Sequence, residues 1–307
     1  MAAPLSWAAA RWFRFFRERN GRQMPLTKKI LVKNGIFPLL DHYYEPLFNT
    51  SRHLSRPLHE ERTLPGIDLN VNEQLDLLRR FHYNDELLAL PLDKTSQRGY
   101  YYHNDVFESG DAEYLYNMIR HVKPRKIIEA GSGFSTLLVI HAIEQNKKED
   151  ASYSCEHTCI EPFENDWLRD TGVRLVKEKA ETLGAGFFSA LGENDILFID
   201  SSHMIRPQGD VLFLYQEVLP QLNKGVWVHI HDIFTPRDYP ARWLIDENRF
   251  WNEQYLLESF LCMNKSFRVT GALNYLVHHH RDALSACCPV LAEEQDREPG
   301  SFWMMKN

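Results

Sequence analysis

The sequence predicts an α/β fold: a doubly wound, mostly parallel β-sheet that is preceded by an N-terminal helical cap. Short apolar runs alternate with amphipathic segments between about residues 111 and 285. Each of these runs is almost continuously apolar, which is typical of parallel strands whose two faces are both covered by helices. Several runs end in glycine, aspartate or histidine, and the carboxyl ends of strands are where such sheets bind their ligands.

The individual elements follow from the spacing of apolar residues. Residues 111–122 carry Leu115, Ile119 and Val122 at helical spacing, and Pro124 ends that helix. Strands are expected at 126–133, 157–162, 173–178, 195–200 and 225–232, helices at 134–146, 209–222 and 251–264, and a final strand or hairpin at 267–279. Strands that alternate with helices in this way predict a sheet of Rossmann type.

We expect the chain to have three parts. Residues 1–110 form a basic arm and a helical, aromatic-rich cap, because the apolar pattern there is irregular and prolines such as Pro38 and Pro46 interrupt it. Residues 111–285 form the sheet domain, and residues 286–307 form a C-terminal tail.

The basic arm has the pattern of an amphipathic helix. The chain carries a net charge of −7, which argues against nucleic-acid binding, yet residues 1–35 contain eight Lys and Arg and one acid, so this part carries +7. One helical face holds Trp12, Phe15 and Phe16, and the other holds Arg11, Arg14, Arg17 and Glu18. Such a helix can lie on an anionic membrane or act as a transit peptide. We favour packing on its own domain or on a second subunit, which would make a homodimer.

The composition predicts a cytoplasmic protein without a transmembrane segment. No apolar run approaches the ~18 to 20 residues that a membrane-spanning helix needs. Arginines interrupt every apolar stretch that resembles a secretory signal. The five cysteines are too few and too irregularly spaced for a disulfide framework, and the pair Cys155 and Cys159 is weak evidence for zinc. We therefore expect reduced thiols.

A glycine loop follows the first predicted strand. The segment IIEAGSGFST places Glu129 before Gly131 and Gly133, and Thr136 stands where a dinucleotide-binding fingerprint would have its third glycine. A carboxylate at Glu129 would repel a pyrophosphate but suits a ligand with an ammonium group. The next strand ends in Glu161, where a carboxylate can accept hydrogen bonds from ribose hydroxyls. A nucleoside joined to an amino acid, S-adenosylmethionine, satisfies both carboxylates.

The motifs EAGSG, CIEP, LFIDSSH and HIHDIF, in this order, resemble the class I S-adenosylmethionine-dependent methyltransferases. The likeness extends over about residues 108–275 and is greatest to a bacterial small-molecule group with I-D-x-x-H and H-D-I-F strand ends. The resemblance implies that Glu161 binds the ribose and that Ala180 and Glu181 flank the adenine. It places the following residues around the methionine part and the sulfonium: Glu129, Gly131, Gly133, Ser135, Thr136 and Asp200.

The Asp and His residues at two strand ends have three competing interpretations. Asp200, His231 and Asp232 resemble the metal-binding acids of catechol-type O-methyltransferases, although the histidine suits Mn²⁺, Fe²⁺ or Zn²⁺ better than Mg²⁺. His203 or His231 can instead act as the general base, and we prefer His203. The third interpretation is that Asp200 and the adjacent serines cap the helix that begins near Pro207.

The sequence therefore predicts an S-adenosylmethionine-dependent methyltransferase that methylates a hydroxyl of a small-molecule acceptor, either a sugar or another secondary metabolite. A lid over the acceptor is expected from the aromatic residues Tyr43, Tyr44, Tyr101 and Tyr102. Two alternatives stay open: a metal-dependent hydrolase that uses the Asp and His strand ends, and a non-catalytic binding or assembly protein that keeps the cofactor fold.

Overall fold

The computed structural model describes residues 2–19, 23–95, 99–163 and 166–307, so part of the arm segment at 20–22 lies outside the described residues. The chain divides into two compact units. The first comprises Met1–Pro57 and Ala241–Phe250, and the second comprises Leu58–Pro240 and Trp251–Asn307. We expected the cap to extend to residue 110, but residues from 58 onward belong to the sheet unit, because Leu77, Leu78 and Leu87 pack into its core.

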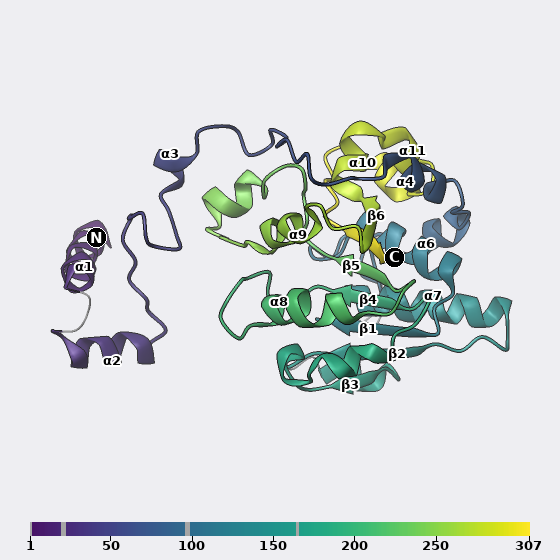
Figure 1. The fold of residues 1–307 in the computed structure, drawn as a ribbon, viewed down its shortest axis with the longest axis horizontal. Coiled ribbons are helices and arrows are strands. Elements are labelled where there is room, and N and C mark those ends of the chain that lie inside the picture. Colours follow the sequence, from purple (N-terminus) through teal and green to yellow (C-terminus); the bar gives the residue numbers. More distant parts are fainter. Residues whose placement is uncertain (1, 20–22, 96–98, 164–165) are drawn as a thin grey trace. The chain divides into compact units, whose positions relative to one another are not determined.

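Seven strands form one sheet in the order β3-β2-β1-β4-β5-β7-β6 (Figure 1). They are β1 (Lys126–Ala130), β2 (Glu156–Ile160), β3 (Arg174–Val176), β4 (Ile196–Ile199), β5 (Trp227–Ile230), β6 (Phe267–Ala272) and β7 (Phe302–Lys306). Strands β1 to β5 are parallel to one another, whereas β7 runs antiparallel to both β5 and β6. The prediction of a doubly wound, mostly parallel sheet is confirmed.

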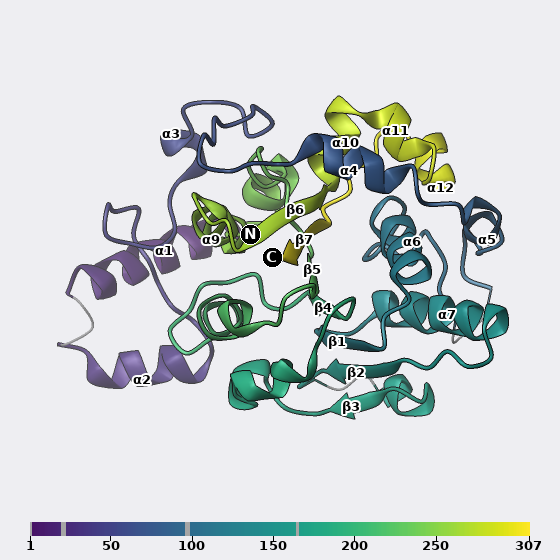
Figure 2. The same cartoon turned by 45° about the vertical axis from the view of Figure 1, so that its right-hand side comes forward.

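Alternation along the central strands produces two cores, one on each face of the sheet. Ile127 and Phe198 belong to the core beneath α6 (Asp111–Val122) and α7 (Phe134–Glu149). Their neighbours Ile128 and Leu197 belong to the opposite core. Figure 2 shows α6 and α7 together on one side of the sheet. Both faces are buried, which explains why the strands are almost continuously apolar.

The remaining helices of the sheet unit are short, and most of them pack around these two cores. They are α4 (Val71–Leu78), α5 (Asn84–Leu88), α8 (Asp210–Phe213), α9 (Glu253–Leu261), α10 (Leu273–His279), α11 (Arg281–Ser285) and α12 (Pro289–Glu293). The predicted helix at 209–222 is α8 followed by a π turn at Leu214–Val218 and a 3₁₀ turn at Leu219–Gln221.

The end of the chain differs from the expectation. Residues 267–279 form β6 and then α10, not a hairpin, and the segment 286–307 contains α12 and β7. The expected tail thus supplies a strand in the interior of the sheet. The physical reason is its apolar content: Phe302, Trp303 and Met304 are all buried between the neighbouring strands and the two cores.

The first unit contains α1 (Ala2–Glu18), α2 (Pro25–Lys33) and α3 (Thr50–His53). Arg17 of α1 forms an ion pair with Glu45. The ring of Phe48 contacts that of Phe250 edge-on, with centroids 5.4 Å apart. Among the described residues, every helix is too short or too polar to cross a bilayer.

Candidate active site

The loop after β1 draws three strand ends together. Gly131 has a φ of +92°, which favours glycine, and a Cβ there would lie 1.8 Å from the carbonyl oxygen of Asp200. The backbone N–H of Asp200 donates to the carbonyl of Ala130 at 2.9 Å, and that of Gly131 donates to the carbonyl of Ile160 at 3.0 Å. The carboxyl ends of β1, β2 and β4 therefore meet at one corner, and glycine is required at position 131.

A cleft of about 280 Å³, here called the cofactor cleft, opens beside this corner. Its walls include five of the residues that the sequence analysis assigns to the cofactor: Gly131, Glu161, Ala180, Glu181 and Asp200. The fold thus brings together residues from the ends of three strands and from the segment after β3, as expected at the carboxyl edge of such a sheet.

The Glu161 carboxylate is fixed in the cleft wall by two backbone donors. The N–H of Phe163 donates to its Oε1 at 2.9 Å, and the N–H of Ser132 donates to its Oε2 at 3.3 Å. Each carboxylate oxygen has two acceptor positions, so both oxygens keep the capacity to accept a hydrogen bond from a ligand hydroxyl. This geometry has the property that ribose binding requires.

Glu129, by contrast, lies beneath the glycine loop and not in the cleft wall. The hydroxyl of Thr136 donates to its Oε2 at 2.6 Å, and its Oε1 lies 2.7 Å from Nε2 of His157. Alternation along β1 places Glu129 on the same face as Ile127, under α7. The expectation that Glu129 faces an ammonium group in the cleft therefore needs correction. We call Glu129, Thr136 and His157 the Glu129 group.

Ser135 and Gly133, which were also expected around the methionine part, lie at the start of α7 and not in the cleft wall. Ser135 is buried in the first turn of α7, and the N–H of Gly133 donates to the hydroxyl of Thr136 at 3.2 Å. These contacts hold the start of α7 in place. Of the methionine-site residues that the resemblance implies, Gly131 and Asp200 are the ones in the cleft wall.

Four side chains, here called the Asp–His cluster, converge beyond the ends of β4 and β5. Nε2 of His203 lies 3.2 Å from Oδ1 of Asp200 and 3.4 Å from Oδ2 of Asp232. Nδ1 of His231 lies 3.5 Å from Oδ1 of Asp200 and 3.6 Å from Oδ1 of Asp232. Asp200, His231 and Asp232 each offer a ligand atom within 4.8 Å of the others, which is compatible with one metal ion.

The charges in the Asp–His cluster shift its pKa values strongly. Burial alone would lower the pKa of His203, but its hydrogen bonds to Asp200 and Glu253 raise it to about 10. Burial likewise opposes protonation of His231, but the charges of Asp232 and Asp200 raise its pKa well above the ordinary range. Burial would raise the pKa of Asp200, yet the charge of His231 and the hydrogen bond from His203 lower it. The surrounding carboxylates therefore favour the protonated form of both imidazoles.

Two buried acids complete the surroundings, and the sequence analysis assigned neither of them. Oε2 of Glu253 lies 2.9 Å from Nδ1 of His203. Oδ2 of Asp111 lies 3.8 Å from Nε2 of His231, and its Oδ1 accepts a hydrogen bond from the N–H of Ser301 at 2.6 Å. Each acid is the first residue of a helix, where acidic residues are common because of the helix dipole. The sequence therefore carried no signal that distinguished them.

The capping interpretation is wrong, because the residue before α8 is Gly209 and no side chain caps this helix. The N–H of Ser202 donates to Oδ2 of Asp210 at 2.8 Å, and its hydroxyl donates to Oδ1 at 2.7 Å. Asp210 is the first residue of α8. The segment DSSH thus divides its roles: Ser202 fixes the loop to the helix, while Asp200 and His203 contact each other.

The four tyrosines that were expected to form a lid lie in different surroundings, and only Tyr102 is part of the core. Tyr102 is buried and its hydroxyl donates to the carbonyl of Leu87 at 3.2 Å, so it cannot line an acceptor pocket. Tyr101 packs edge-on against Phe134. Tyr43 and Tyr44 lie in the first unit, where they are exposed.

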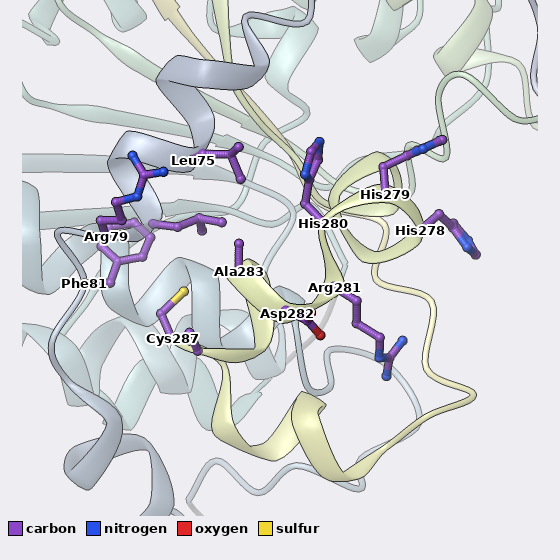
Figure 3. A pocket seen from close by; sticks show the side chains of 12 residues that line it. Leu75, Arg79, Phe81, His278, His279, His280, Arg281, Asp282, Ala283 and Cys287 are labelled. Carbon is purple, nitrogen blue, oxygen red and sulfur yellow. The ribbon is translucent and has the colours of Figure 1, made fainter.

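A separate cavity of about 690 Å³ lies between α4 and the α10–α11 segment (Figure 3). Leu75 and Phe81 contribute apolar walls, and Arg79 and His280 contribute polar ones. It shares no lining residue with the cofactor cleft. None of the predicted site residues lines this cavity; they lie at the ends of the parallel strands and in the loops that follow them.

Comparisons with known proteins address the family. A protein-family model described as a methyltransferase domain matches residues 128–233, from β1 to the residue after Asp232. An uncharacterized protein from Archaeoglobus fulgidus is 34% identical over 175 residues, which are 52% of this chain and 76% of that protein. The crystal structure of an O-methyltransferase from Bacillus cereus in complex with SAH covers 77% of this chain and 91% of that chain, at 11% identity and a TM-score of 0.39. With the family model matching from β1 through the Asp–His cluster, the chain belongs to the class I S-adenosylmethionine-dependent methyltransferases.

Proposed function

We propose that this methyltransferase transfers the methyl group of S-adenosylmethionine to a hydroxyl oxygen of a small molecule, such as a sugar or another secondary metabolite. One observation carries the proposal: Asp200 lines the cofactor cleft and also contacts both histidines of the Asp–His cluster. Methyl transfer needs the acceptor oxygen in line with the donor carbon while the oxygen loses its proton. A residue common to both places supports a reaction between them.

In this proposal the chain holds the cofactor through the cleft wall. Glu161 accepts hydrogen bonds from the two ribose hydroxyls, since its carboxylate is already oriented by backbone donors. Ala180 and Glu181 flank the adenine. Gly131 lets the sulfonium end approach the backbone closely, because a side chain at this position would collide with Asp200.

The residues present also fit a divalent cation. Two carboxylates and one imidazole converge, and the neighbouring Asp111 and Glu253 add negative charge that protonated histidines do not fully balance. Asp200, Asp232 and His231 would hold the ion, with a preference for Mn²⁺, Fe²⁺ or Zn²⁺. When bound, such an ion would acidify a coordinated hydroxyl and lower the proton affinity of the neighbouring imidazoles.

The chain's own groups handle the proton of the acceptor. We assign it to His203 in its neutral form, which a bound cation would favour by lowering the proton affinity of the ring. Nε2 of His203 faces Asp200 and Asp232, while Glu253 holds Nδ1. Glu253 thereby fixes the orientation of the ring. His229 lies in β5, two residues before His231, and it does not take part in the proposed proton transfer. It is completely buried, and its Nε2 lies 2.9 Å from the hydroxyl of Ser301.

Calorimetry with S-adenosylhomocysteine tests the cofactor part. We expect binding by the wild-type chain and a weakening on the order of ten- to hundredfold for Glu161→Ala, the worth of hydrogen bonds to a charged group. Glu178→Gln, at an exposed residue outside the cleft wall, is the matched control and should bind normally. An absence of binding at millimolar ligand would reject the proposal.

Chelation tests the metal part separately. Treatment with EDTA should abolish methyl transfer from labelled S-adenosylmethionine to an acceptor found by screening, and Mn²⁺ should restore it. Calorimetry should also show Mn²⁺ binding that Asp232→Asn removes. Full activity in excess chelator would eliminate the metal while leaving the methyl transfer proposal intact.

A further inference from the structure

The first unit exposes an exceptional amount of apolar surface. Among the residues that the structure describes, twenty-one large hydrophobic side chains are exposed, and fourteen of them lie before residue 49. So many exposed large apolar side chains in one short part of a chain indicate an interaction site rather than an ordinary protein surface. None of the fourteen lines the cofactor cleft, so they call for another explanation.

Helix α1 combines apolar and basic side chains on its exposed surface. Leu5 is 75% exposed and Trp7 is 65% exposed. The guanidinium of Arg11 lies 5.1 Å from the centre of the Trp7 ring, and that of Arg19 lies 3.7 Å from the centre of the Phe15 ring. Aromatic rings with guanidinium groups beside them suit the boundary between lipid headgroups and acyl chains.

Helix α2 repeats this combination. Leu26, at 71%, and Ile30, at 52%, are exposed. Lys28 and Lys29 are exposed on the same short helix, which also ends in Lys33. Helices α1 and α2 therefore both present large apolar side chains among cations. We call the exposed side chains of α1 and α2 the basic aromatic surface.

We propose that the basic aromatic surface docks the enzyme on an anionic lipid membrane as a peripheral protein. An amphipathic helix with Trp, Phe and Leu among Arg and Lys residues inserts its apolar side chains at the headgroup boundary, while its cations attract anionic lipids. The charge of +7 on residues 1–35 supplies that attraction. The docking is independent of the methyl transfer reaction.

The alternative occupants match this surface less well. In a dimer formed through the arms, two copies would each bring a charge of +7 to the same interface. The body of the chain carries the complementary charge of −14, since the total is −7. However, beyond residue 48 the exposed large apolar side chains of the described residues are few and far apart in the sequence, such as Leu88, Phe163 and Met263. A lipid surface offers both an apolar layer and negative charge.

Flotation of the full chain with lipid vesicles tests the proposal. One set of vesicles contains phosphatidylcholine alone, and the other contains equimolar phosphatidylcholine and phosphatidylglycerol. We expect the chain to float mainly with the anionic vesicles, and we expect added salt to weaken the association. A chain that stays with the soluble fraction for both compositions at low salt would overturn the proposal.

Three paired variants identify the surface responsible. Arg11→Glu with Lys29→Glu reverses two charges and should lower vesicle binding by on the order of tenfold or more, since each basic residue contributes about 1 kcal/mol near an anionic surface. Leu5→Gln with Leu26→Gln should weaken binding to the anionic vesicles through lost insertion. Lys224→Glu with Lys265→Glu makes the same charge change on exposed residues of the sheet unit, and this control should bind as the wild type does.

Sedimentation of the same proteins separates the lipid from a protein partner. The proposal is supported if the arm variants lose vesicle binding with an unchanged sedimentation coefficient and an unchanged thermal unfolding temperature. It is overturned if the wild type is a dimer that does not bind vesicles and if the substitutions in the arm dissociate this dimer. It is also overturned if the control pair loses vesicle binding as much as the Arg11 and Lys29 pair.

Discussion

Two groups of carboxylates and imidazoles lie at the carboxyl side of the same sheet, and they differ in access and in charge. In the Glu129 group the carboxylate is completely buried, and both of its oxygens have a partner inside the protein. In the Asp–His cluster the side chain of Asp200 is 25% exposed and lines a cleft. There two carboxylates meet two imidazoles, and Asp111 and Glu253 add further negative charge.

The comparison teaches that an acid at a strand end is not a catalytic feature by itself. A completely buried carboxylate such as Glu129 stabilises the fold through its internal partners, but a ligand in the cleft cannot reach it. A carboxylate with solvent access and unbalanced charge around it can bind a cation or take part in proton transfer. Substitutions in the two groups and in their surroundings test this distinction.

Asp200→Asn should reduce methyl transfer by about 10²- to 10⁴-fold, the range found for groups that take part in proton transfer. The change keeps the shape of the side chain but removes the charge that His203 and His231 share. Turnover of labelled S-adenosylmethionine measures the effect. Glu129→Gln is the matched comparison in the closed group, and an equal loss of turnover in both variants would break the distinction.

Glu129→Ala should lower the free energy of unfolding by about 3 to 5 kcal/mol, since each buried group left without its hydrogen-bond partner costs about 1 to 3 kcal/mol. The substitution leaves His157 and the hydroxyl of Thr136 without their shared acceptor. Urea unfolding followed by circular dichroism gives the value. If the alanine variant does not fold, Glu129→Gln supplies the comparison. A loss of unfolding free energy smaller than that caused by Asp200→Asn would contradict the prediction.

Glu113 is a second closed carboxylate, and its titration sharpens the comparison. It accepts hydrogen bonds from the N–H groups of Gly110, Val290 and Leu291, yet burial raises its pKa from 4.5 to about 7. The folded state therefore holds the proton more tightly than the unfolded state. The corresponding stability is fully present below pH 4.5 and is lost as the pH rises through 7.

The loss should amount to about 3 kcal/mol, since one pKa unit corresponds to about 1.4 kcal/mol. Glu113→Gln has no proton to lose. The difference in unfolding free energy between this variant and the wild type should therefore shift in favour of the variant as the pH rises from 4.5 through 7. Urea unfolding at several pH values measures both curves. Parallel curves for the two proteins between pH 4.5 and 7 would show that Glu113 does not titrate there.

Ser202→Ala should have the smallest effect, a loss of about 1 kcal/mol in the free energy of unfolding, the usual contribution of one hydrogen bond. The change removes the hydroxyl donor to Asp210 but keeps the backbone donor. Thermal unfolding detects it, and turnover should stay within twofold of the wild type. A large loss of turnover would show that the loop, and not only Asp200 and His203, belongs to the reactive part.

The sequence was sufficient to predict the parallel sheet and the edge at which its polar strand ends meet. Apolar runs that end in Gly131, Glu161, Asp200 and Asp232 placed these residues at one edge, and the sheet order shows those strands to be neighbours. Periodicity could not show which way Glu129 points, because a strand buried on both faces has no polar side to orient it. Nor could it find Glu253, whose partner His203 is 50 residues away in the chain.

Strand β7 has a consequence for the order in which the enzyme can be assembled. It lies between β5 and β6, and the residue before it, Ser301, contacts both His229 and Asp111. A nascent chain must therefore keep the edges of β5 and β6 open until residues 301–306 have been synthesised. Unpaired strand edges invite pairing with other chains. A polypeptide truncated before β7 would lack not a tail but the strand that closes the sheet beneath the reactive histidines.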